Sequence, residues 1–404
     1  MQQGVLRFAV SDALCQFCYE KDGAPALNVR LEEGRLCVWA YYTASDKPLL
    51  LSGNAKAGDA VRLVLQPFRI ELYVNDQLLD EEWPFGDACF ADAELTQCNV
   101  ELTQEEILPP CAEPCVTGSF TGAEGWYPGN GVFVGDCMPY TFAGRYHLLY
   151  LKDRRHHGSK WGKGAHQWAH ISSADLQHWD VHPMAVTIDD AREGSICTGS
   201  WIFEGGRHYL YYTVRMADGS SAPICRSVSE DGYHFSKDTT FHFTLSALYT
   251  GASARDPKVV RGADGCLHMF VTTTQVATGK GCLVHLTSED GEQWAEQGTI
   301  YVAPDAGEPE CPDYFAYRGR YYLIFSHGAR AQYRYSDKPF TDWQMPENPN
   351  IPCHSVPKAA IWQDRIIFAG FIGLGGYAGS LTFMEATVDE KGELTYLPVR
   401  EMQA

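Results

Sequence analysis

The chain has 404 residues and a formal net charge of −19 at pH 7, from 32 Lys and Arg against 51 Asp and Glu. This length allows two or three domains with large buried cores, and a hydrophobic fraction of 45% excludes a disordered chain. The acidic balance disfavours nucleic acid and membrane surfaces as partners, because binders of both normally present a basic face. A neutral carbohydrate is a compatible partner, and the sequence leaves a homo-oligomer open.

No apolar run approaches the roughly 20 residues that span a bilayer, and the N-terminal residues lack a basic region followed by an apolar one. We therefore expect neither a membrane segment nor a signal peptide. The 14 cysteines then favour free thiols in a reducing compartment, so we expect a cytoplasmic protein. We also expect no metal or other cofactor. His157, His166 and His170 are candidate ligands, but without helical ligand spacing we interpret them as structural histidines.

Strand patterns dominate the chain. Short runs rich in β-branched and aromatic residues lie between Gly, Asp, Asn or Pro, which is typical of β-strands. No segment shows the periodicity of an amphipathic helix of three clear turns. The sequence therefore predicts an all-β fold, with strands over 5–10, 35–43, 61–66, 69–75, 146–152, 208–214, 267–273, 321–327 and 365–371.

Residues 1–105 form a first block. EEGR (32–35) and VNDQ (74–77) each lie between strand-like runs and predict β-hairpins. A β-sandwich is the architecture that such a block favours. Residues 106–120 contain three prolines and no periodicity, which predicts a linker.

Residues 121–404 contain an internal repeat, which is the most informative feature of the sequence. A turn followed by an aromatic-rich strand occurs five times, and a small residue, an acid, a turn and an aromatic residue follow four of them. Roughly 50–60 residues separate successive units, about the length of the four antiparallel strands of one propeller blade. Five units predict a five-bladed β-propeller. The recurring strands are 143–151, 205–214, 264–273, 318–327 and 363–371, and the second signatures are 172–179, 229–235, 288–294 and 336–343.

The repeat also aligns candidate catalytic residues. Each recurring strand opens at a Gly or Asp, and eight or nine residues before it lie Asp136, Thr198, Asp256, Glu310 and Val356. In a propeller this preceding strand is the innermost one, so equivalent positions on different blades converge near the axis. Three carboxyl groups packed there repel one another and raise at least one pKa, which suits a site that needs one carboxyl protonated and one ionised. For any single acid, a turn cap or a solvated loop is the alternative.

Four segments resemble motifs of glycoside hydrolase family 32, the invertase and levanase type. SARDPKVV (253–260) resembles the family's arginine-aspartate-proline motif, and EPECPDYF (308–315) resembles its glutamate-cysteine motif. Residues 161–179 resemble the tryptophan-histidine-alanine segment after the first-blade strand, and SICTGSWIF (195–203) resembles the serine-glycine-serine strand. The order and spacing agree with the family over about residues 126–385.

The resemblance implies a five-bladed propeller that hydrolyses β-fructofuranosides such as sucrose or fructo-oligosaccharides, with retention of configuration and without a metal. It implies that Asp136 is the nucleophile, Glu310 the general acid/base and Asp256 the transition-state stabiliser. Arg255 would orient this cluster and contribute to substrate binding. A retaining mechanism places the nucleophile and acid/base carboxyls about 5–5.5 Å apart.

Three further residues are candidates for substrate binding. Trp168 corresponds to a substrate-facing tryptophan of the family, and Trp126, at the entrance to the first inner strand, is placed to stack on a sugar ring. For each tryptophan, a packed position between neighbouring sheets is the alternative. Thr198 occupies the repeat position of the acids in the second unit and completes the set.

The chain also departs from the family's pattern. Gly135 precedes and Cys137 follows Asp136, where the family has an asparagine-aspartate-proline motif, and the expected sandwich precedes the propeller instead of following it. Three alternatives stay open: a related furanosidase or xylosidase that inverts configuration, a propeller that binds glycans without cleaving them, and fructosyl transfer in place of hydrolysis. Three converging acids favour an enzyme over a binding module, and the glutamate-cysteine motif favours the retaining family.

Overall fold

The computed structural model describes residues 4–43, 48–65, 70–82, 88–105, 118–129, 131–154, 166–190, 192–216 and 218–402. Within these ranges the chain consists of β-strands joined by turns and contains no α-helix, so the predicted all-β fold is confirmed. The described helices are short 3-10 turns, Cys89–Asp92, Gly251–Ser253 and Arg400–Met402. None of the helices in these ranges has the length and apolarity needed to cross a membrane.

The chain divides into two compact units. The first contains Met1–Glu113 with Ser159–Ala165 and Ile188–Ser195, and the second contains Pro114–Gly158, His166–Thr187 and Ile196–Ala404. The predicted linker, 106–120, lies outside the described residues as far as residue 117. The domain boundaries at 105 and 121 stay predictions.

The first unit contains two antiparallel sheets. Its strands are β1 (Gly4–Ala9), β2 (Cys15–Lys21), β3 (Ala24–Glu32), β4 (Arg35–Ala40), β5 (Leu49–Asn54), β6 (Ala60–Leu65), β7 (Ile70–Val74), β8 (Gln77–Glu82), β9 (Glu94–Cys98) and β10 (Thr103–Glu105). One sheet has the order β10-β1-β6-β7-β8 and the other β5-β4-β3-β2-β9. The two-residue turns 33–34 and 75–76 have positive φ at both positions and join β3 to β4 and β7 to β8. Turns of this kind match the twist of the strands, and both predicted hairpins are confirmed.

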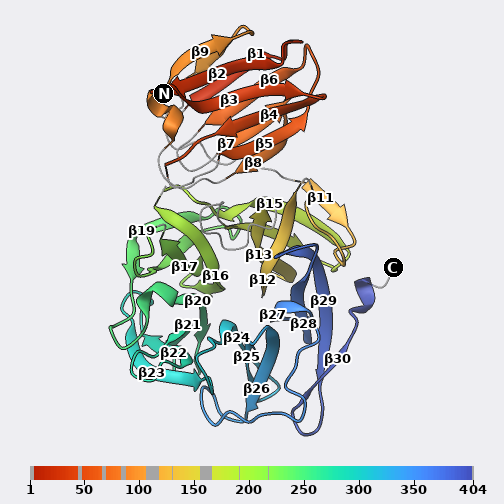
Figure 1. Cartoon of the computed structure of the whole chain (residues 1–404). Coiled ribbons are helices and arrows are strands. Elements are labelled where there is room, and N and C mark those ends of the chain that lie inside the picture. The colour runs from red at the N-terminus through yellow and green to blue at the C-terminus, as the bar shows by residue number, and fades with distance from the viewer. Residues whose placement is uncertain are drawn as a thin grey trace. The chain divides into compact units, whose positions relative to one another are not determined.

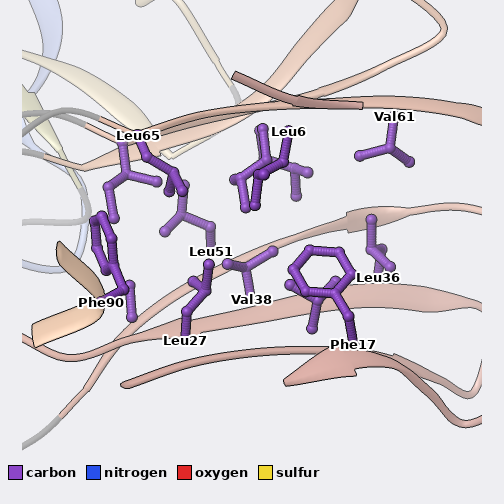
Figure 2. Close-up of a cluster of buried hydrophobic side chains, with 14 of the residues drawn as sticks. Leu6, Phe17, Leu27, Leu36, Val38, Leu51, Val61, Leu65 and Phe90 are labelled. Atoms are coloured by element: carbon purple, nitrogen blue, oxygen red, sulfur yellow. The ribbon is translucent and has the colours of Figure 1, made fainter. Parts of the chain in front are cut away.

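One hydrophobic core includes side chains from both of these sheets (Figure 2). In β1, Leu6 and Phe8 are buried while Arg7 between them is exposed, as alternation along a half-buried strand requires. Leu6 of one sheet lies opposite Phe17 of the other in Figure 2. Removing such apolar surface from water contributes about 25 cal/mol per Å², which makes this core the main stabilising feature of the first unit.

The strands of the second unit pair mostly with their neighbours along the chain. They are β11 (Gly118–Thr121), β12 (Val132–Phe142), β13 (Arg145–Arg154), β14 (Gln167–Ser173), β15 (His178–Val186), β16 (Glu193–Glu204), β17 (Arg207–Met216), β18 (Ile224–Ser229), β19 (Ser236–Phe243), β20 (Arg255–Arg261), β21 (Leu267–Thr274), β22 (Gly281–Ser288), β23 (Ala295–Val302), β24 (Glu310–Tyr317), β25 (Arg320–His327), β26 (Arg330–Ser336), β27 (Ser355–Trp362), β28 (Arg365–Gly373), β29 (Gly379–Val388) and β30 (Leu394–Leu397). They form the groups β11–β15, β16–β19, β20–β23, β24–β26 and β27–β30. The pair Val134 and Gly379 joins the first group to the last. The labels β12, β16, β20, β24 and β27 lie toward the middle of this unit in Figure 1.

The sequence repeat corresponds to a repeated hairpin. The recurring strands are β13, β17, β21, β25 and β28, and each pairs with the strand that precedes it. The second signature forms the turn after the next strand, where an aspartate carboxylate accepts backbone N–H bonds from residues two and three further on. These turn aspartates are Asp175, Asp231 and Asp290.

A β-bulge interrupts four of the strands that precede the recurring ones. In each case three steps along one strand lie opposite two steps along its partner, so one residue is extra. The bulges lie between Val134 and Cys137, Arg255 and Lys258, Glu310 and Asp313, and Ser355 and Lys358. Inside three of them a residue other than glycine has a φ between 45° and 59°, a conformation that costs backbone energy and that clusters at functional sites. These residues are Asp256, Cys311 and Val356.

Candidate active site

The three predicted carboxylates lie at these bulges. Asp136 is inside the bulge of β12, Asp256 is inside that of β20, and Glu310 is the residue at which the bulge of β24 begins. The acids nevertheless do not share the one register position that the sequence predicted: counted from the residue at which each bulge begins, Glu310 is at the first position, Asp256 at the second and Asp136 at the third. Counting back from the hairpin misses these offsets, because the bulges lie at different distances from their turns and the turns differ in length. The common bulge, which redirects side chains, is what the acids share.

Cys311 lies between the two aspartates. Its Sγ is 3.4 Å from Asp136 Oδ2 and 3.4 Å from Asp256 Oδ2, and its backbone N–H donates to Asp256 Oδ2 at 3.0 Å. Thr198 Oγ1 donates to Asp256 Oδ1 at 2.5 Å. All four residues are buried. The structure therefore brings the predicted Thr198 into the cluster as a donor that orients Asp256.

Arg255 connects the acids of the neighbouring strands. Its Nη2 donates to Glu310 Oε1 at 2.8 Å, its Nη1 donates to Glu308 Oε2 at 2.5 Å, and its Nε lies 3.6 Å from Asp256 Oδ2. Burial opposes the charge of this guanidinium, but the three carboxylates raise its pKa further above the ordinary value, so it is a permanent cation. The side chain of Glu310 is 54% exposed, so this acid, unlike the two aspartates, is open to a ligand from solvent.

Asp136 has neutral donors around its carboxylate. Tyr377, from the turn between β28 and β29, donates its hydroxyl to Asp136 Oδ1 at 2.8 Å, while the thiol of Cys311 faces Oδ2. Burial, with the charges of Asp256 and Glu310, raises the pKa of Asp136 to about 6, and the bond from Tyr377 opposes that rise. The pKa values of Tyr377 and Cys311 are well above their ordinary values, first because of burial and then because of the neighbouring carboxylates, so both remain neutral donors. Burial is thus the main cause of the raised pKa of Asp136, and the predicted crowding of acids adds to it.

The structure places the two candidate tryptophans in packing contacts. Trp168 is fully buried and donates its indole N–H to the carbonyl of Cys197 at 2.8 Å. Trp126 is half-buried and stacks on Phe120 with ring centroids 4.0 Å apart. The backbone carbonyl of Trp126 accepts the N–H of Leu381 in β29, so this residue connects the first and last groups of strands. These contacts favour the packing interpretation for both, because each indole ring is engaged with neighbouring residues of the protein.

A cavity of about 400 Å³ lies on the other side of the bulges and contains none of the three acids. Its lining includes Lys258, Asp313 and Lys358, the residues at which three of the bulges end. Lys258 Nζ lies 2.6 Å from Asp313 Oδ1, and the other oxygen of Asp313 accepts the N–H of Ala359 at 2.8 Å. This pair ties three strands together and is separate from the candidate catalytic cluster.

The candidate metal-ligating histidines have partners within the protein. His166 Nε2 lies 2.7 Å from Asp153 Oδ1, and both side chains are buried. His170 Nε2 lies 3.0 Å from His147 Nδ1, and burial holds the pKa of His170 well below its ordinary value. His157 lies outside the described residues. In the part of the chain that the structure describes, no group of three His, Cys, Asp or Glu side chains could hold a metal ion.

The sequence analysis missed the contacts of three residues at the site. Cys311 belongs to the glutamate-cysteine motif, so its place beside the acids follows the motif, but its contacts with both aspartates do not follow from sequence spacing. Tyr377 lies in a glycine-rich turn, Gly373–Gly379, where no motif marks it. Glu308 also lies in the glutamate-cysteine motif, but its contacts do not follow from the motif: it shares Arg255 with Glu310 and accepts a hydrogen bond from Thr274 at 2.7 Å.

Comparisons with known protein families place this geometry in context. Residues 137–348 match the profile described as "Glycosyl hydrolases family 32 N-terminal domain", which is more than half of the chain. The matched range contains Arg255, Asp256 and Glu310 and begins one residue after Asp136. The family match therefore covers the motifs of β20 and β24 but not the divergent first motif or Tyr377.

Individual relatives give a similar result. A sucrose-6-phosphate hydrolase of Escherichia coli is 27% identical over 302 residues, which cover 65% of this chain and 61% of that protein. The chain thus matches less than two thirds of the length of this relative. The structure of fructan 1-exohydrolase IIa from Cichorium intybus aligns with a TM-score of 0.57 and 19% identity, over 70% of this chain and 61% of that one. A thermostable family-43 glycoside hydrolase aligns with a TM-score of 0.50 and 14% identity, over 70% of this chain and 97% of that one. At these identities the two structures show a common fold.

Proposed function

The chain belongs to glycosyl hydrolase family 32, and on this basis we propose that it is a glycosidase that cleaves β-fructofuranosidic bonds with retention of configuration. The proposal assigns Asp136 as nucleophile, Glu310 as general acid/base and Asp256 as the group that binds sugar hydroxyls. The relatives that carry activities in their names match over only part of their length, so the substrate and the reaction belong to this proposal.

The proposed reaction has two displacements. A carboxylate oxygen of Asp136 attacks the anomeric carbon as the bond to the leaving-group oxygen breaks, and the carboxylic acid of Glu310 donates its proton to that oxygen. A fructosyl ester of Asp136 and a carboxylate on Glu310 result. Water then attacks the same carbon, Glu310 takes a proton from the water, and Asp136 is released as a carboxylate. Two inversions give net retention.

The observation that carries this proposal is the cluster around Arg255 and Cys311. Separate strands bring Asp136, Asp256 and Glu310 there, and Arg255 is the cation in contact with the last two. Gathering acids in a partly buried place costs stability, and such clusters with perturbed pKa values are typical of catalytic sites. A propeller that only binds glycans has no use for this arrangement.

A substrate panel tests the proposal. Initial rates of reducing-sugar release are measured with sucrose, sucrose 6-phosphate, inulin-type and levan-type oligosaccharides, and an aryl arabinofuranoside. We expect activity on at least one fructoside, loss of that activity in Asp136→Asn and Glu310→Gln, and retention of it in Asp342→Asn, which alters an exposed acid. The phosphorylated substrate is included because the relative from E. coli is named for it. Cleavage of the arabinofuranoside alone would overturn the assignment to fructosides.

An inverting furanosidase or xylosidase is the second candidate, and the likeness of the fold to a family-43 glycoside hydrolase supports it. In that case Asp136 activates water, and the product has the opposite anomeric configuration. NMR of the first-formed sugar, recorded before mutarotation, separates the two mechanisms. The contact of Arg255 with Glu310, within motifs matched by family 32, favours retention.

The proposal includes the architecture and the compartment. Five repeated hairpins and the fold similarity to known glycosidases support a five-bladed propeller, and two sheets around one core support a β-sandwich before it.

The cysteines that the structure describes, Cys15 and Cys18 of the C-x-x-C pair in β2 among them, are free thiols. Free thiols support the cytoplasm as the site of action.

A further inference from the structure

Asp136 lies in the most divergent motif of the chain, and its two carboxylate oxygens face different donors. Tyr377 donates its hydroxyl to Oδ1 at 2.8 Å, whereas Oδ2 faces the weaker thiol donor of Cys311 at 3.4 Å. The hydroxyl comes from a different segment of the chain, the turn between β28 and β29. The two oxygens of Asp136 therefore differ, because one is fixed by a strong donor and the other is not.

The ring of Tyr377 is held in place from two sides. His166 stacks on it with centroids 5.2 Å apart, and Phe371 meets it edge-on at 5.4 Å. His166 is itself fixed by Asp153, whose Oδ1 lies 2.7 Å from its Nε2. A tyrosine supported in this way loses little freedom when its hydroxyl binds a carboxylate, so the geometry is preorganised.

Gly135 provides the space that the hydroxyl of Tyr377 needs. A Cβ added at Gly135 would lie 2.9 Å from the Tyr377 oxygen and 3.1 Å from the carbonyl oxygen of Leu151. The residue before the nucleophile is therefore small because a tyrosine from another part of the chain occupies that space. This relation is specific to the first motif of the chain, which departs from the family pattern at Gly135.

We propose that Tyr377 is a positioning residue for Asp136, holding Oδ1 so that Oδ2 is directed at the anomeric carbon of the sugar. This inference rests on the proposed function and deepens it. When the ester forms at Oδ2, Oδ1 becomes the ester carbonyl oxygen and keeps the same donor. Donation to the ionised form also counters the effect of burial and of the charges of Asp256 and Glu310, which together raise the pKa of Asp136 to about 6.

The main test is Tyr377→Phe, which keeps the stacked ring and removes the hydroxyl. We expect kcat/KM to fall about ten- to a hundredfold, as for loss of a hydrogen bond to a charged group, with the loss in kcat and little change in KM. The acidic limb of the pH profile, near pH 6 in the original protein, should move to higher pH because the donor that lowers the pKa of Asp136 is gone. The control is Tyr322→Phe, which removes a buried hydroxyl bonded to the carbonyl of Gly392. An acidic limb that stays in place in Tyr377→Phe would overturn the proposal.

A double mutant tests the contact from its other side. Gly135→Ala should reproduce the kinetic defect of Tyr377→Phe, since its methyl group displaces the hydroxyl. The combination Gly135→Ala with Tyr377→Phe should be no worse than the more severe single variant, because phenylalanine lacks the hydroxyl oxygen, which is the nearest of the atoms that the new methyl group meets. Additive losses would show that the two positions act independently and would contradict the proposal.

One measurement needs no substrate and so separates failure of this inference from failure of the proposed function. Aspartate is labelled with 13C at the side-chain carboxyl, and the signal of Asp136 is assigned by its absence in Asp136→Asn. We expect its titration midpoint to be higher in Tyr377→Phe than in the original protein and in Tyr322→Phe. Equal midpoints would overturn the positioning role even if the protein cleaves fructosides, and a shifted midpoint would support it even if the substrate lies in another sugar class.

Discussion

The carboxylates of the candidate site are held in two different ways on its two sides. On the side of β20 and β24, Arg255 donates to Glu308 and Glu310 and lies beside Asp256. On the side of β12, Asp136 accepts hydrogen bonds from neutral groups. The pKa values follow this difference. Although partial burial opposes it, the charge of Arg255 lowers the pKa of Glu308, whereas burial raises that of Asp136 to about 6.

The difference corresponds to different tasks. A guanidinium paired with a nucleophilic carboxylate stabilises the free carboxylate more than the neutral ester, and such ground-state binding slows the attack. Neutral donors orient the carboxylate with less of this penalty. A residue that only binds sugar hydroxyls keeps its charge throughout, so a cation beside Asp256 carries no such cost. The arrangement therefore agrees with Asp136 as nucleophile and Asp256 as binding group.

The largest effect is expected from Glu310→Gln, on the side held by the cation. General acid catalysis contributes about 10²–10⁴-fold, so hydrolysis of a substrate with a poor leaving group should fall by that amount. An activated aryl fructoside needs little protonation of its leaving group and should lose much less. The ratio of kcat/KM for the two substrates measures the difference. Equal losses on both would contradict the acid role.

The second largest effect is expected from removing the cation, Arg255, which should lower the stability of the fold. Arg255→Met leaves Glu308 and Asp256 without their charge partner, which costs about 3–5 kcal/mol for a buried pair. The matched control is Arg261→Met, whose pair with Glu204 is partly exposed and should cost about 0–1 kcal/mol. The lowered pKa of Glu308 contributes stability that is fully present above the ordinary value of 4.5 and is lost as the pH falls from there through the lowered pKa, so the deficit of Arg255→Met should shrink over that interval. Urea unfolding at pH 7 and pH 4 tests both statements.

On the side of β12, we expect stability to depend on pH with the opposite sign. The pKa of Asp136 is raised from 3.8 to about 6, so the folded state binds this proton more tightly than the unfolded chain, and stability falls as the pH rises through that interval. The difference corresponds to about 3 kcal/mol. Asp136→Asn keeps an acceptor for Tyr377 and removes the charge, so it should gain stability relative to the original protein on going from pH 4 to pH 7.5. The same urea measurement checks this. If the free energy of unfolding of Asp136→Asn differs from that of the original protein by the same amount at both pH values, the pKa of Asp136 is not raised and the prediction is wrong.

Much of the fold followed from local patterns. The hairpins at 33–34 and 75–76 and the five recurring strands depend on turn residues and alternating side chains, which act over a few positions. The arginine-aspartate-proline and glutamate-cysteine motifs likewise identified Arg255, Asp256 and Glu310. These features are local, so their residues carry the signal themselves.

The remaining parts depend on contacts between distant segments. Tyr377 and Asp136 are 241 residues apart, and no spacing rule connects them. Trp168 is buried and its indole N–H bonds to the carbonyl of Cys197 on another strand, a contact that the motif in which it lies does not reveal. The offsets among the three acids arise from the bulges and from unequal strand and turn lengths, which a count of residues does not include. Sequence analysis therefore identified the acids but not the register in which they meet or the neutral donors around Asp136.

The smallest effect is expected from Thr198→Val, which removes the donor to Asp256 Oδ1 while keeping the shape of the side chain. Asp256 retains the backbone N–H of Cys311 at 3.0 Å and the neighbouring guanidinium of Arg255, so its orientation does not depend on one bond. We expect kcat/KM to fall between a few-fold and about tenfold, the net value of an ordinary hydrogen bond. The loss in Tyr377→Phe should be larger, because among the described residues no cation and no backbone N–H donates to the carboxylate of Asp136. A larger loss in Thr198→Val than in Tyr377→Phe would reverse the comparison, since it would make Asp256 the carboxylate that depends on a single neutral donor.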